Sequence, residues 1–205
     1  MKKVHRNSLT YKNYIISPVE DFSILAGFSC INPDDPDQDL NEFVRQDAEQ
    51  HYLDKIAVTY ILKDKRNPNI VLGFATLQND AIIIDGKEQI PSIASYEYKT
   101  FPAIKIGRFG ISIAYQRKNF GTLFLFMLKK LMLKANRTGC RFITVDARRI
   151  KKQKIDTRPF YRKNGFSDLP SRGKTSTYCP MYFDLKSIVD AHERGLLFTD
   201  SASEQ

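Results

Sequence analysis

The chain has 205 residues with 32 lysines and arginines against 23 aspartates and glutamates, so its formal net charge at pH 7 is +9. This length suits one domain with its own core, and a hydrophobic content of 42% excludes a natively unfolded chain. The longest apolar run, 123–128, is well short of the roughly 18 residues that a membrane-spanning helix needs.

The first residues and the cysteines indicate where the protein is located and whether it has disulfides or a metal site. Met1-Lys2-Lys3 is followed by polar residues where the apolar part of a signal peptide would have to begin, so we expect a cytoplasmic protein. The cysteines are odd in number, lie far apart and have no metal-ligand spacing with the histidines. We therefore expect neither a disulfide framework nor a metal site.

Apolar spacing and turn residues predict the elements in the first half of the chain. In chain order, these are a strand at 14–16, weak helical signals at 20–27, a turn cluster at 32–37, a helix capped by Asp39, and strands at 57–63 and 70–77 joined by a polar loop at 65–69. The last two strands have the pattern of an antiparallel hairpin.

The second half alternates strands and helices. In chain order, we expect a sheet extension at 81–84, an irregular insertion at 91–102, a strand at 104–113, a buried helix at 121–135, a strand at 142–147, a helix at 157–163, a strand at 178–185 and a frayed tail at 199–205. The passage from 104 to 147 is long enough for a crossover, so its two strands should be parallel. The sequence thus predicts one α/β domain, 1–205, with a mixed sheet and a core at about 14–185.

The segment 115–122 lies between a predicted strand and the start of the buried helix. Unpaired amides at a helix N-terminus favour phosphate, and Arg117 and Lys118 add positive charge beside them. A pyrophosphate would fit there. The segment is neither a Walker loop nor a dinucleotide fingerprint, because the lysine-serine ending and the three-glycine pattern are both missing.

Three segments in the same order resemble the GNAT superfamily of N-acetyltransferases. Gln116-x-x-Asn119-x-Gly121, between the strand ending at Ile113 and an apolar helix, is similar to its acyl-CoA-binding motif. The segment 160–166 resembles its second cofactor-side motif, and 180–185 resembles its closing strand. The resemblance implies a GNAT-like α/β fold: a mixed, mainly antiparallel central sheet flanked by helices, with a parallel strand-helix-strand acyl-CoA-binding unit.

Within the superfamily, the segments 28–30, 39–43 and 104–108 are most similar to toxin-type acetyltransferases, which act on the amine of aminoacyl-tRNA. This resemblance implies acetyl-CoA as co-substrate, no metal, and charged tRNA and a small antitoxin protein as partners. A homodimer follows only by analogy with the same relatives.

The resemblance also assigns a cofactor site. Backbone amides near 111–113 would polarise the thioester, and the loop after them would hold the pyrophosphate. The cofactor-binding candidates are Ile111, Ser112, Ile113, Gln116, Arg117, Lys118, Asn119, Phe120, Gly121, Thr122 and Phe160. Asn119 stands where the superfamily usually has glycine. Asparagine tolerates left-handed backbone, so the loop can keep its shape, but this departure raises the alternative of a catalytically impaired acyl-CoA- or nucleic-acid-binding protein.

Tyr161 matches the tyrosine that, in the superfamily, protonates the departing CoA thiolate. A phenol suits this role because its reference pKa of about 10 keeps it protonated, and therefore able to donate, at physiological pH. The alternative is that Tyr161, flanked by Phe160 and Phe166, is only a core aromatic.

Basic residues dominate the segment 148–163, where Asp156 is the single acid. A block of one sign can bind a polyanion by releasing its counterions. The nucleic-acid-binding candidates are Arg148, Arg149, Lys151, Lys152, Lys154 and Arg158. The alternative is that these residues neutralise the CoA phosphates or keep the surface hydrated.

The function that the resemblance implies is acetyl-CoA-dependent transfer of an acetyl group to a primary amine. In its specific form, the acceptor is the α-amine of aminoacyl-tRNA and the protein is the toxin of a toxin-antitoxin pair. A small-molecule or protein amine is the alternative acceptor.

Overall fold

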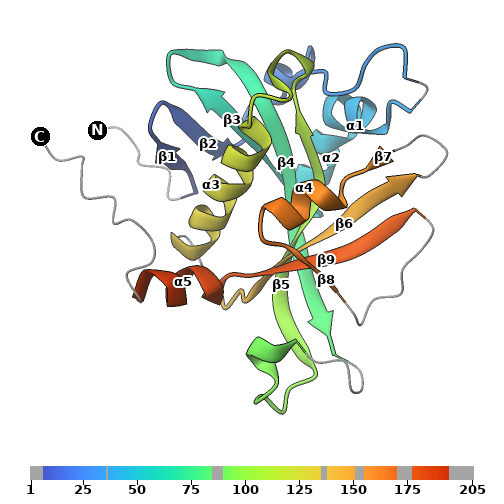
Figure 1. Ribbon diagram of the computed structural model, residues 1–205. Coiled ribbons are helices and arrows are strands. Elements are labelled where there is room, and N and C mark those ends of the chain that lie inside the picture. Colours follow the sequence, from blue (N-terminus) through green and yellow to red (C-terminus); the bar gives the residue numbers. More distant parts are fainter. Residues whose placement is uncertain are drawn as a thin grey trace, which may run out of the picture.

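The computed structural model describes residues 7–35, 37–84, 90–134, 138–150, 155–169 and 177–193. Its strands are β1 Leu9–Tyr11, β2 Tyr14–Pro18, β3 Val58–Asp64, β4 Asn67–Ile83, β5 Thr100–Ile111, β6 Phe142–Ile150, β7 Ile155–Asp156, β8 Ser167–Asp168 and β9 Tyr178–Asp184. Within the described residues they form one nine-stranded sheet, ordered β1-β2-β3-β4-β5-β6-β9-β8, with β7 beside β6 (Figure 1).

The helical elements fall on both sides of this sheet. They are the 3-10 helices η1 Phe22–Leu25, η3 Pro91–Ile93 and η4 Ile113–Tyr115, the π-helix η2 Phe43–Asp47, and the α-helices α1 Asp39–Glu42, α2 Ala48–Leu53, α3 Phe120–Lys134, α4 Arg158–Lys163 and α5 Lys186–Glu193. Across these ranges, no helix is long and apolar enough to cross a membrane.

The sheet is antiparallel except at one pair. β5 and β6, which α3 connects, run parallel with the register Ala103↔Phe142 to Ile106↔Val145. All other pairs, from β1–β2 to β8–β9, are antiparallel. The predicted α/β class, with a mainly antiparallel sheet and one parallel strand-helix-strand unit, is confirmed.

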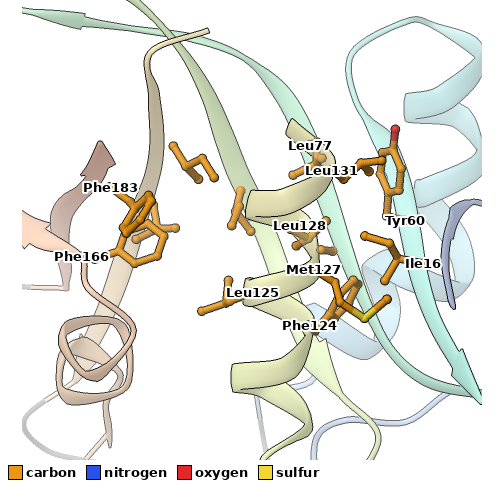
Figure 2. Packing of buried hydrophobic residues seen from close by; sticks show 14 of the residues in the cluster. Ile16, Tyr60, Leu77, Phe124, Leu125, Met127, Leu128, Leu131, Phe166 and Phe183 are labelled. Carbon is orange, nitrogen blue, oxygen red and sulfur yellow. The ribbon is translucent and has the colours of Figure 1, made fainter. Parts of the chain in front are cut away.

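Helix α3 covers one face of the sheet because its side chains are apolar around most of its circumference. Leu125, Leu128 and Leu131 are at most 1% exposed and belong to a core cluster that includes Ile16 and Leu77 from the strands (Figure 2). Burying a side chain of this size contributes about 1.5–3 kcal/mol. α3 is therefore a fixed platform, and the position of its first turn is set by the sheet beneath it.

The continuous segment of α1, η2 and α2 packs on the opposite face. Phe43, Val44 and Ala48 join Ile61 and Phe74 of the strands in a second cluster. The sheet is thus covered on both faces, by α3 on one and by α1, η2 and α2 on the other (Figure 1).

The structure corrects several boundaries. Asp39 is the first residue of α1 and Gln38 occupies the cap position, so the prediction that Asp39 caps the helix is wrong. The β3–β4 turn contains only residues 65 and 66, because the Asp64 carboxylate accepts hydrogen bonds from the backbone and guanidinium of Arg66 and tightens the reversal. The strand predicted at 104–113 begins at Thr100 and ends at Ile111.

Candidate functional site

The predicted site lies where the parallel strands β5 and β6 separate. Their pairing ends at Ile106 and Val145, whereas β5 continues to Ile111 beside β4. β6 continues to Ile150 beside β9 and β7. The backbone groups that β5 and β6 would otherwise share beyond this point are therefore directed into the opening between the two strands.

One of the three predicted strand-end amides points toward this opening. Ser112 N donates to Leu72 O at 2.9 Å, and Ile113 N donates to Ser29 O at 3.0 Å. Because successive amides of a strand point to opposite edges, the Ile111 amide faces away from β4 and toward β6. The amides of Ser112 and Ile113 are occupied by protein carbonyls, so of these three amides that of Ile111 is the one directed at the opening.

The side chain of Gln116 fastens the loop between β5 and α3. Its Nε2 donates to Cys30 O at 2.7 Å and to Ile111 O at 3.0 Å, which uses both of its N–H groups. The Lys118 ammonium donates to Ala114 O at 2.9 Å and keeps further protons for a ligand. Gln116 therefore acts by ordering this loop, and Lys118 remains able to contact an anion.

Two residues with left-handed backbone shape the turn that leads into α3. Arg117 has φ 59° and Asn119 has φ 64°. Alternating backbone handedness turns successive amides toward a common point, an arrangement that binds anions. Leu123 N donates to Asn119 O at 3.1 Å, so the amides of 120–122 come before the first helical hydrogen bond and have no acceptor within the helix.

The backbone at Asn119 gives the first prediction. We expect Asn119→Ala to lower the free energy of unfolding by about 1 kcal/mol, because a Cβ-bearing residue without a local polar side chain is disfavoured at positive φ. Asn119→Gly should match or exceed the wild type. Urea unfolding of the three proteins measures the difference, and an alanine variant as stable as the wild type would contradict the left-handed turn.

The side chains of the first turn of α3 have separate roles. Phe120 packs its ring edge-on against Tyr14 and Tyr115, so only its backbone is available to a ligand. A Cβ added at Gly121 would come within 3.1 Å of the Phe160 ring. The absence of a side chain at Gly121 therefore allows α4 to approach α3 closely.

Phe160 lies between the end of β5 and the start of α3. Its ring centroid is 6.0 Å from that of Phe109 and 5.2 Å from that of Tyr161. It is partly buried and packs against the main core cluster. The structure thus places Phe160 beside both elements that would enclose the arm of a coenzyme.

Tyr161 is the next residue of α4 and is partly buried between two aromatic rings. The Phe160 and Phe166 centroids lie 5.2 and 5.4 Å from its own. Burial raises the pKa of the Tyr161 phenol well above its ordinary value. None of the described residues forms a hydrogen bond with its hydroxyl. The phenol is therefore protonated at physiological pH and can act as a proton donor.

The end of α4 is fixed by a complete Schellman motif. Phe166 N donates to Tyr161 O at 3.0 Å and Gly165 N donates to Arg162 O at 2.9 Å. Gly165 has φ +80°, which this motif requires at the residue after the cap. The Asn164-Gly165 pair therefore determines where Tyr161 sits at the start of the last helical turn.

A buried lysine connects this cap to α3. The Lys129 ammonium donates to Asn164 O at 2.5 Å and lies 3.6 Å from the Phe183 ring centroid, with 8% of the residue exposed. A cation at a helix C-terminus interacts favourably with the helix dipole. Lys129 thus holds the helix of Tyr161 against the helix whose first turn has the free amides. Burial lowers the pKa of Lys129 to about 8.

This lowered pKa makes stability depend on pH in a defined direction. Between pH about 8 and 10.5, the unfolded chain keeps a proton on Lys129 that the folded chain has released. The free energy of unfolding therefore increases as the pH rises through this window. The difference in this free energy between the wild type and Lys129→Met should therefore grow across that window by up to about 3 kcal/mol.

Urea unfolding of both proteins at each pH measures this difference. Subtraction removes the contribution of Cys30, whose pKa burial raises to about 12 and which destabilises the fold at alkaline pH. Lys134→Met, which removes an exposed lysine of the same helix, is the matched control. A difference that stays constant with pH would show that Lys129 is not a buried cation.

The positive charge of the basic segment at 148–163 is partly neutralised in the folded structure by carboxylates that pair with its arginines. Arg148 forms an ion pair with Asp37, and Arg162 forms one with Asp168 at 3.0 Å. Arg158 binds Asp156 through two nitrogens and lowers the pKa of that carboxyl to about 2. Two of these carboxylates come from segments outside the basic block, which a count along the chain does not reveal.

The remaining nucleic-acid-binding candidates of the basic block divide into two groups. Arg149 lies in β6 beside Asp156 of β7. Lys151, Lys152 and Lys154 lie outside the described residues.

Among the described residues, no group of three or more potential ligands is arranged to hold a metal ion.

The sequence alone did not reveal the contacts of Lys129 with Asn164 O and the Phe183 ring, or those of Arg108 with Asp39 and Phe43. Lys129 offered one signal, a lysine directly after the apolar run 123–128 in a helix predicted to be buried, where a charge requires a partner. Arg108, whose guanidinium lies 4.1 Å from the Phe43 ring centroid, offered none, because the contact joins residues far apart in the chain.

Comparisons with known proteins find solved structures with a similar fold. A scan against protein-family models finds no matching family, and a search of curated proteins finds no match. The structure of AtaT complexed with acetyl-methionyl-tRNAfMet matches with a TM-score of 0.67 at 21% identity, covering 87% of this chain and 99% of that chain.

Two further structures give similar agreement. AtaTR bound with acetyl-CoA matches with a TM-score of 0.65 at 22% identity, covering 89% of this chain and 99% of the other. A KacT mutant with one tyrosine replaced by phenylalanine matches with a TM-score of 0.66 at 18% identity, covering 87% and 98%. The chain therefore has the GNAT-like fold of the AtaT and KacT toxin structures.

Proposed function

Because the chain has the fold of these toxin structures, we propose that it is an acetyl-CoA-dependent N-acetyltransferase whose acceptor is the α-amine of aminoacyl-tRNA. The observation that carries the proposal is the turn before α3. There, left-handed residues at Arg117 and Asn119 precede three amides without helical acceptors. Such a turn at a helix N-terminus suits a diphosphate.

The residues around the opening supply what acetyl transfer needs. The neutral amine attacks the thioester carbonyl, and the Ile111 amide donates to the oxygen that becomes negative. As the new C–N bond forms and the C–S bond breaks, the CoA thiolate takes the Tyr161 proton, the amine nitrogen releases one to water, and the Tyr161 phenolate regains a proton from water. An α-amine with a reference pKa of about 7.7–8 has a usable neutral fraction, so no strong protein base is required.

The acceptor assignment rests on charge and on the likeness to AtaT. The formal charge of +9 favours a polyanionic partner, and a solved structure has AtaT complexed with acetyl-methionyl-tRNAfMet. AtaT is also seen with the C-terminus of its antitoxin AtaR and acetyl-CoA. We extend this to the proposal that a small antitoxin inhibits the present chain.

One observation supports a second candidate acceptor. Arg148, Arg158 and Arg162 already have carboxylate partners, which reduces the positive charge that they offer to a nucleic acid. Acetylation of a small-molecule or protein amine is accordingly the alternative.

The experiment that separates these acceptors supplies labelled acetyl-CoA with a panel of amines. Charged tRNA, the same tRNA after deacylation, a peptide with a free N-terminus and a polyamine are offered in turn. We expect CoA release and label transfer with charged tRNA alone. Turnover with the peptide or polyamine but not with charged tRNA would establish the alternative acceptor, and no turnover with any amine would contradict the enzyme.

A further inference from the structure

Two arginines stand on opposite sides of the opening between β5 and β6. Arg108 follows the last paired residue of β5, Ile106, by two positions, and Arg148 follows the last paired residue of β6, Val145, by three. Both reach toward the α1 side of the sheet. The Arg108 guanidinium stacks 4.1 Å above the centroid of Phe43 in η2, and Arg148 pairs with a residue just before α1.

The partners of both arginines come from one short acidic segment. Asp37 binds Arg148, and Asp39 Oδ1 lies 3.7 Å from Arg108 Nη2. The segment 34–39 contains four aspartates, which is a high local density of negative charge. Neither guanidinium is saturated, since the Nε of each is buried without a hydrogen-bond partner among the described residues.

The backbone of this acidic segment is held by the side chain of Gln38, whose Nε2 donates to Asp35 O at 2.6 Å. The buried Asn41 side chain accepts from Cys30 N at 2.8 Å and donates to Ile31 O at 3.1 Å and to Gln38 Oε1 at 2.7 Å. The two carboxylates are therefore presented to the arginines on a held loop. Releasing either arginine needs a side-chain rotation and leaves these backbone contacts in place.

Arg148 is also directly connected to the helix of Tyr161. Its carbonyl oxygen accepts from Thr157 N at 2.9 Å and from Thr157 Oγ1 at 3.2 Å. Thr157 is the cap residue of α4, and its own carbonyl accepts from Tyr161 N at 3.3 Å. Arg148 is therefore joined to the helix of Tyr161 through its backbone, whereas its guanidinium lies on the side of the sheet that faces α1.

We propose that Arg108 and Arg148 form a phosphate-binding pair for the acceptor nucleic acid, and that Asp37 and Asp39 occupy this pair until phosphates displace them. The planar guanidinium binds carboxylate and phosphate with the same paired geometry, so one anion can replace the other without moving the arginine. While both ion pairs are formed, Asp37 and Asp39 compete with the phosphates of the substrate for the two arginines. This inference rests on the proposed tRNA acceptor and names the residues that would receive it.

The test measures binding of labelled, deacylated tRNA by fluorescence anisotropy at one fixed low salt concentration. Asp37→Asn with Asp39→Asn should tighten binding about fivefold, because two partly exposed ion pairs together oppose displacement by about 1 kcal/mol. Arg108→Gln with Arg148→Gln should weaken binding about tenfold through the loss of two phosphate contacts. In the chain carrying all four changes, the tightening should disappear.

The control removes the same amount of negative charge elsewhere. Asp64→Asn with Asp190→Asn breaks two ion pairs that lie on the β3–β4 turn and on α5. Equal tightening by this control pair, or tightening by the aspartate variants that survives in the four-residue variant, overturns the proposal. If the Arg148→Gln variant does not fold, the Arg108→Gln variant alone provides the test. Its ion pair with Asp39 is the longer of the two, so its loss should disturb the fold less.

The outcome is separable from that of the proposed function. Neither acetyl-CoA nor turnover enters the binding measurement, so the arginine pair can be established in a chain that transfers no acetyl group. If the chain acetylates a small amine but binds tRNA equally well with and without the two arginines, the acetyltransferase proposal stands and the phosphate-binding pair is contradicted.

Discussion

Replacing Tyr161 with phenylalanine should lower kcat for acetyl transfer by about 100- to 10,000-fold, the range over which a positioned general acid contributes. The KM for acetyl-CoA should change little. The phenol is partly buried, has a raised pKa, and has no hydrogen-bond partner among the described residues, so its loss removes a proton donor without breaking a structural contact. Steady-state kinetics with charged tRNA measure both constants.

The pH dependence gives this prediction a second readout. Because the Tyr161 pKa lies far above physiological pH, the wild-type rate should rise with pH as the acceptor amine, with a reference pKa of about 7.7–8, becomes neutral. Tyr182→Phe, which removes a partly buried phenol from β9, is the matched control and should retain activity. A Tyr161→Phe enzyme with wild-type kcat would leave the phenol as a core side chain only.

Placing a negative charge in the first turn of α3 should abolish most acetyl-CoA binding while leaving the fold intact. We expect Thr122→Asp to weaken binding by about 100-fold, because at an effective dielectric near 20 a carboxylate a few ångströms from a phosphate costs several kcal/mol before screening. The same carboxylate should stabilise the helix by about 0.5 kcal/mol through its dipole. Binding is measured by calorimetric titration, and stability by urea unfolding.

Thr122→Asn separates charge from shape. Asparagine has the size of aspartate without its charge, so this variant should bind acetyl-CoA within a few-fold of the wild type. Equal loss of affinity in both variants would show that the first turn of α3 responds to bulk and does not face a phosphate.

Most of the sheet could be predicted because its strands are long runs of β-branched and aromatic residues interrupted by polar turns. β3 and β4 were recognised from such runs, and the β5-α3-β6 unit from its length. β1 and α5 were missed. β1 has only three residues and is defined by its pairing with β2, from Leu9↔Ile16 to Tyr11↔Tyr14, which is a tertiary interaction without a local signature.

The site was predictable to the extent that it is local in sequence. The loop 115–122 and the Tyr161 helix were found because their residues are neighbours in the chain. The engagement of Ser112 and Ile113 depends on the carbonyls of Leu72 and Ser29, which lie far away in sequence. The charge of the basic segment was overestimated for the same reason, since Asp37, the ion-pair partner of Arg148, lies far away in the sequence.

The central claim is that the turn before α3 grips the diphosphate of a coenzyme and so directs its thioester toward Ile111 and Tyr161. A crystal structure of the wild-type chain with acetyl-CoA tests it most directly. We predict phosphate oxygens at hydrogen-bonding distance, about 2.7–3.2 Å, from the amides of residues 120–122, with the sulfur beside the Tyr161 hydroxyl. A coenzyme that is absent at saturating concentration, or whose diphosphate lies away from this turn, would contradict the account.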